Sequence, residues 1–167
     1  TWTAIIAAFL LALALGNHIG GRVAAASDLR QRLCVAAGAM LAAALAIAVT
    51  PLAMPWWDAA ILNAAPATPW RIVTFAAAPC LPAGLALGIA TPLLMTTALA
   101  LSRSHAVAGL VYGAGATGSV CGVLCVLWWW LDALGTRATL LGIALVALAL
   151  AAAIATTALT RSQTALA

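Results

Sequence analysis

A long stretch without a single charge, GLVYGAGATGSVCGVLCVLWWW, runs from Gly109 to Trp130 and limits what this chain can fold into. Such a stretch is typical of a helix that crosses a bilayer, since a hydrocarbon core of roughly 30 Å needs about 20 apolar residues. The remaining sequence agrees, because 66% of the 167 residues are hydrophobic and 6% are charged. Soluble domains carry about 25% charged residues. The sequence therefore predicts an integral membrane protein.

The apolar segments predict an all-α bundle of about five transmembrane helices in one domain, residues 1–167. The expected spans are residues 2–21, 33–54, 81–101, 106–131 and 138–160. Prolines at 79, 82 and 92 are expected to break the third span. The fourth span is rich in glycine, and Gly135 is expected to end a helix in the turn at 132–137.

Prolines and tryptophans gather in the segment PLAMPWWDAAILNAAPATPW, from Pro51 to Trp70. Proline is disfavoured inside helices, and tryptophan is enriched where a membrane meets water. The pattern therefore predicts an irregular segment at the interface over about 51–79, with residues 71–79 as a short outer helical piece.

The arginines predict an orientation in the membrane. Five of the seven fall on one side of the predicted bundle, namely Arg22, Arg30, Arg32, Arg103 and Arg161. Loops on the cytoplasmic side carry an excess of basic residues, so the N-terminus is expected outside and the C-terminus inside a bacterial inner (cell) membrane. All seven tryptophans then fall at the outer face. The net charge of +4 reflects these loops, and no nucleic-acid partner is expected.

Four glycines of the fourth span are the predicted helix-packing residues. They form two pairs at a spacing of four, Gly109 with Gly113 and Gly118 with Gly122. Small residues at this spacing let two helix backbones approach closely in lipid. The fourth span is therefore expected at the centre of the bundle beside the third. Its glycine grooves are also expected to pack against partner membrane proteins, lipids or pigments.

A few polar side chains are candidates for ligand or cofactor contact. His18 and His105 lie near the predicted inner ends of the first and fourth spans. There they either hold a haem or pigment, relay protons, or cap helix ends. Asn17 and Tyr112 are candidates for an interhelical hydrogen bond or a ligand contact.

Two further groups allow more than one interpretation. Arg22, Arg30 and Arg32 either anchor the inner loop to anionic lipid headgroups or latch the inner gate of a transporter. Cys121 and Cys125 lie one helical turn apart and share a face, which suits copper(I) but is explained more simply by core packing.

The sequence offers no catalytic residues and no metal-ligand spacing, so no enzyme activity is expected. Coupled transporters usually keep an ionisable group near the middle of the bilayer. Here every Asp and Arg falls at a predicted helix end or loop. This placement argues against an autonomous proton-coupled carrier.

Three segments, in order, resemble one family. Gly16, Gly20, Gly21 and Arg22 match a glycine-rich helix end followed by a basic loop, and Asp28 stands in for an acidic residue that usually follows more closely. PAGLALGIATPLL carries Pro82, Gly88 and Pro92, and GLVYGAGATGSVCG carries Gly109, Tyr112, Gly118 and Gly122. Together they resemble the major-facilitator-like membrane domain of fused spermidine-synthase-like proteins.

The resemblance implies membrane architecture only. It implies that the family's first membrane helix and its aminopropyltransferase domain are missing from these residues. The expected function is a non-catalytic integral membrane subunit or anchor that packs against partner membrane proteins. One alternative is a transporter-like domain with a pathway between the first, third and fourth spans. Another is a redox subunit associated with haem or pigment through His18 and His105.

Overall fold

The computed structural model describes residues 2–64, 68–102 and 106–164, and every secondary-structure element in these ranges is a helix. The elements are α1 (Trp2–Ala26), α2 (Leu29–Ala64), α3 (Thr68–Ser102), α4 (Ala106–Cys125), the short π-helix η1 (Val126–Trp130) and α5 (Leu131–Thr164). The predicted all-α class is confirmed for this part of the chain.

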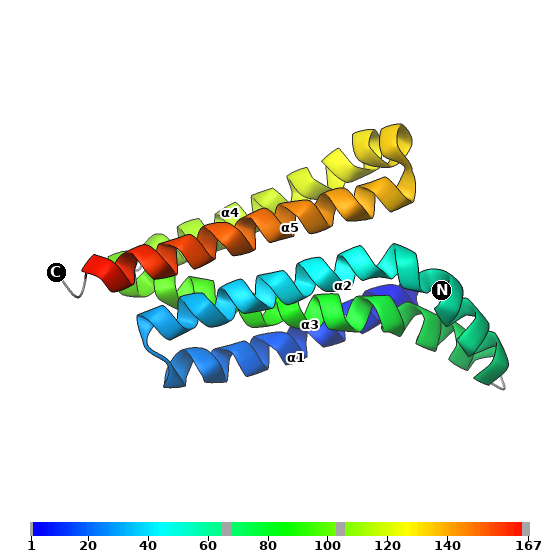
Figure 1. Cartoon of the computed structure of the whole chain (residues 1–167), viewed down its shortest axis with the longest axis horizontal. Helices are drawn as coiled ribbons and strands as arrows, with labels where there is room; N and C mark the ends of the chain where they lie inside the picture. Colours follow the sequence, from blue (N-terminus) through cyan, green and yellow to red (C-terminus); the bar gives the residue numbers. More distant parts are fainter. Residues whose placement is uncertain (1, 65–67, 103–105, 165–167) are drawn as a thin grey trace.

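Successive helices run in alternating directions along the long axis of the molecule (Figure 1). Helix α1 packs against α3, and α2 packs against both α3 and α5. Helix α4 lies outside this group, with a small contact to α3. The helices α1, α2 and α3 therefore form the body of the bundle, and α5 joins it along α2.

Four helical stretches are long and apolar enough to cross a membrane, where the sequence predicts five. They are Thr3–Ala26, Leu29–Ile61, Val73–Ser102 and Ala106–Thr160. The last stretch has 55 residues and contains both the fourth and the fifth predicted spans. The backbone leaves helical geometry at Gly135 (φ 73°, ψ 168°), and the chain folds back there into a hairpin (Figure 1). The counts differ because helix follows helix through the turn at Gly135, with no non-helical segment between the two arms.

The prediction of an irregular segment is wrong for residues 51–64 and 68–70, which are helical. Residues 71–79 are helical as predicted, but they continue into the third span as one helix. Helix α2 continues through Pro51 and Pro55, and α3 continues through Pro79, Pro82 and Pro92. The predicted break of the third span at its prolines is therefore also wrong. A proline removes only one backbone hydrogen bond, and long apolar helices tolerate this loss where neighbouring groups compensate. Residues 65–67 lie outside the described ranges.

The predicted first loop at 22–32 is also mostly helical, because only Ser27 and Asp28 separate α1 from α2. The Asp28 Oδ1 atom accepts a hydrogen bond from the Gln31 backbone N–H at 2.7 Å, which caps the start of α2. The Arg32 Nε atom donates to the Ser27 carbonyl at 3.0 Å. These bonds satisfy backbone groups at the connection, so the Asp28 and Arg32 side chains stabilise the turn between α1 and α2.

Small residues make up most of the core. One buried cluster joins α2, α3 and α5 through Met40, Ala44, Ala90, Ala147 and Ala151. A second joins α1, α2 and α3 through Ala24, Ala36 and Leu93. Leu93 is the large side chain that the described structure buries completely. With alanine at most contact points, the helices pack at short distances.

Candidate functional site

Helices α1 and α3 cross in close contact at four buried glycines. They are two pairs at a spacing of four, Gly16 with Gly20 on α1 and Gly84 with Gly88 on α3. A Cβ atom added to Gly16 would overlap the Leu85 carbonyl oxygen and lie 2.9 Å from the Gly88 Cα atom. Backbone therefore meets backbone at this point.

The reverse side of the crossing is equally tight. A Cβ atom on Gly88 would lie 2.5 Å from the Leu13 carbonyl oxygen and 3.0 Å from the Asn17 backbone nitrogen. A Cβ atom on Gly20 would lie 2.5 Å from the Ile89 carbonyl oxygen. Each of these separations is shorter than side chains normally reach, so only glycine fits.

The packing centre predicted from the sequence lies on the wrong helix. Gly109, Gly113, Gly118 and Gly122 are all exposed, and a Cβ atom on any of them would have no neighbour within 4 Å. No described residue of α4 is buried. Helix α5 packs along α2, and α4 makes only a small contact with α3, which leaves the small residues of α4 facing outward. The spacing of four that marks these glycines also marks Gly16–Gly20 and Gly84–Gly88, so the signal for the true crossing was present.

A hollow of about 540 Å³ lies between α1, α3 and α4. Its wall is mostly apolar and includes the hydroxyls of Thr91, Tyr112 and Ser119. The Thr91 hydroxyl donates to the Leu87 carbonyl at 3.0 Å, and the Ser119 hydroxyl donates to the Gly115 carbonyl at 2.9 Å. Tyr112 is 77% exposed, so its phenol remains available to a ligand. The hollow lies between the three helices predicted to border a transport pathway.

The other candidate contact residues are not gathered at this hollow. Asn17 and His18 are exposed on α1, and neither lines it. His105 lies outside the described ranges, so the predicted pairing of His18 with His105 stays a prediction. Arg22 and Arg30 are exposed near the α1–α2 connection, and Arg32 is half-buried there. The arginines thus lie where an inner-loop anchor was predicted.

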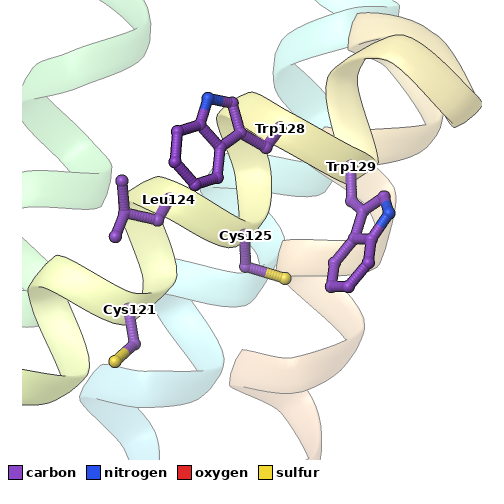
Figure 2. Close-up of a pocket in the computed structure, with 5 residues that line it drawn as sticks. All are labelled: Cys121, Leu124, Cys125, Trp128 and Trp129. Atoms are coloured by element: carbon purple, nitrogen blue, oxygen red, sulfur yellow. The ribbon is translucent and has the colours of Figure 1, made fainter.

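A second hollow, of about 470 Å³, lies at the end of α4 and in η1. It is lined by Cys121, Leu124, Cys125, Trp128 and Trp129, drawn in Figure 2. Both cysteines are exposed free thiols, which corrects the expectation that they pack in the core of this chain. The shared face of the two thiols was predicted from the sequence, but the tryptophans beside them were not predicted to join the same site.

Comparison with known proteins gives no match, whether to a family model, to a curated protein or to a solved structure.

Proposed function

We propose that this chain is a non-catalytic integral membrane subunit that packs through α4 against a helix of a partner membrane protein. The observation that carries this proposal is the contrast between two sets of glycines with the same spacing. Those of α1 and α3 are buried against each other, whereas a Cβ atom added to Gly109, Gly113, Gly118 or Gly122 would meet no other helix of this chain within 4 Å. A helix with uncovered small residues is suited to a close contact with a second helix in lipid.

In this proposal the chain crosses the membrane five times, with the two arms of the α4–α5 hairpin as the last two crossings. The N-terminal end of α1, the C-terminal end of α2 and the turn between α4 and α5 share one end of the bundle (Figure 1). The exposed Trp56, Trp128 and Trp129 belong to this end. Arg22 and Arg30 belong to the opposite end. This distribution supports an outer tryptophan-rich face and an inner arginine-rich face of a bacterial inner membrane.

The test is to replace Gly113 and Gly118 by leucine and to purify the natively expressed protein in mild detergent. We expect Gly113→Leu/Gly118→Leu to lose its co-purifying membrane protein, since each leucine fills the space that a partner backbone would occupy. Thermal unfolding should change little, because both positions face open space in this chain. Mass spectrometry of the purified fraction measures the loss.

The matched control places two leucines on α5 instead, as Ala149→Leu/Ala153→Leu, at positions that are also exposed. This variant should keep the partner. A wild-type protein that purifies alone, or a glycine double variant that keeps its partner, would contradict the proposal.

The alternative is a transporter-like domain of the kind found in spermidine-synthase-like proteins. It is supported by the hollow between α1, α3 and α4, to which Thr91 and Tyr112 contribute hydroxyl groups. With labelled spermidine as the probe, proteoliposomes should accumulate it, and Thr91→Val and Tyr112→Phe should slow the initial uptake. Thr96→Val is the control, because its hydroxyl donates to the Pro92 and Leu93 carbonyls and does not line the hollow. Uptake equal to that of protein-free liposomes would exclude spermidine transport.

A further inference from the structure

Two thiols on consecutive turns of α4 stand without a role in the packing of this chain. Cys121 and Cys125 are both exposed and free. Side chains four residues apart on a helix have Cβ atoms roughly 5–6 Å apart. A disulfide needs Cβ atoms about 3.5–4.5 Å apart, so helical geometry opposes a bond between the two sulfurs. The pair is therefore kept as two thiols that face the same hollow.

Two indole rings complete the wall of this hollow. Trp128 and Trp129 are 76% and 74% exposed, and both line it together with the cysteines. In Figure 2 the Cys125 sulfur points toward the ring of Trp129, while the Cys121 sulfur points away from it, one turn earlier. Aromatic faces attract cations, and tryptophan does so most strongly. The hollow thus combines two soft donor atoms with two cation-attracting surfaces.

The backbone at this point is unusual. The π-helix η1 begins directly after Cys125, and the Leu131 N–H bonds to the Val126 carbonyl across the wider turn. Single π-turns are rare in proteins overall, but those that occur are frequently found at functional sites. Here the π-turn carries both tryptophans.

We propose that Cys121 and Cys125 bind one copper(I) ion, with the indoles of Trp128 and Trp129 flanking it. Thiolates are soft ligands that select copper(I), whereas structural zinc takes four ligands. In the part of the chain that the structure describes, no three His, Cys, Asp or Glu residues form a group that suits a metal. A two-ligand site therefore favours copper(I) over zinc.

Binding involves no electron transfer. Each thiol gives its proton to water at the tryptophan-rich membrane surface, and each thiolate sulfur forms one bond to an ion that arrives and remains as copper(I). Binding therefore releases two protons. The Cys121 side chain must turn about its Cα–Cβ bond toward Cys125, which its exposed position allows.

The experiment is an anaerobic competition titration of the full chain in detergent, with copper(I) buffered by a chromogenic chelator. We expect one ion per chain and a thiolate-to-copper charge-transfer band in the ultraviolet spectrum. Loss of even an outer-shell partner weakens metal sites by about 10–100-fold, so removing a ligand should cost at least about 100-fold. Cys121→Ala and Cys125→Ala should each show this loss, and zinc(II) should not displace the copper.

Cys34→Ala is the matched control, because Cys34 is an exposed thiol on α2 far along the chain from the hollow. It should bind copper(I) like the wild type. Circular dichroism of each variant shows that the helices are intact. Unchanged affinity in Cys121→Ala/Cys125→Ala, an equal loss in Cys34→Ala, or displacement by zinc(II) would overturn the proposal.

Discussion

Gly16→Ala is expected to destabilise the bundle by about 1–3 kcal/mol, the usual cost of forcing an added methyl group into a packed contact. The new Cβ atom would overlap the Leu85 carbonyl oxygen, and backbone cannot move aside as a flexible side chain can. To relieve the overlap, α1 and α3 must separate along their crossing. The measurement is the free energy of unfolding in mixed detergent micelles, followed by circular dichroism.

Gly21→Ala provides the matched control on the same helix. Gly21 has no neighbouring atom within 4 Å of an added Cβ atom, and it differs from Gly16 in little else. Alanine is the better helix former by roughly 0.5–1 kcal/mol, so this variant should be unchanged or slightly more stable. A loss at Gly21 as large as the loss at Gly16 would show that the crossing is not the cause.

Leu93→Ala is expected to cost about 2–5 kcal/mol, the range found when a buried leucine is cut back to alanine. Leu93 is 0% exposed and packs with Ala24 of α1 and Ala36 of α2. Its neighbours are already small, so they cannot extend to fill the space that the side chain leaves. The same detergent unfolding experiment measures the change.

The control is Leu101→Ala, a leucine on the same helix that is 48% exposed. Its side chain lies at the surface of the bundle, so surrounding lipid or detergent takes the place of the lost atoms. The expected change is within about 0.5 kcal/mol. If both leucines cost the same, burial in the second cluster does not explain the stability of α3.

The helical class and the rough position of each helix were predictable because they depend on local features. Apolar length alone indicates α1, α2 and α3, and Gly135 marks the turn between α4 and α5 since its φ of 73° suits glycine. Helix ends were less predictable. Pro51 and Pro55 favoured an early end to α2, yet the helix continues past both. At these two positions the tendency of proline to end a helix is outweighed by the long apolar helix that surrounds them.

The packing site was not predictable by the same reasoning. The pairs Gly16–Gly20, Gly84–Gly88 and Gly109–Gly113 have one spacing, and spacing alone cannot decide which pair meets a partner within the chain. That choice depends on which helices become neighbours. In the structure α1 packs directly against α3, although α2 lies between them in the sequence. The hollow beside Cys121 has the same origin, because α5 and not α4 packs against α2.

The crossing of α1 with α3 also sets an order in which the protein must form during synthesis. Helix α1 leaves the ribosome before α2 and α3, but its glycine face meets α3 only after the whole of α2 and the middle of α3 have been made. Until then α1 is kept near α2 by the short connection between them, which has only two residues, Ser27 and Asp28. The α1–α3 contact therefore cannot form before α3 has been made. In a nascent chain halted after α2, Gly16 and Gly20 remain uncovered and can contact other membrane helices nearby.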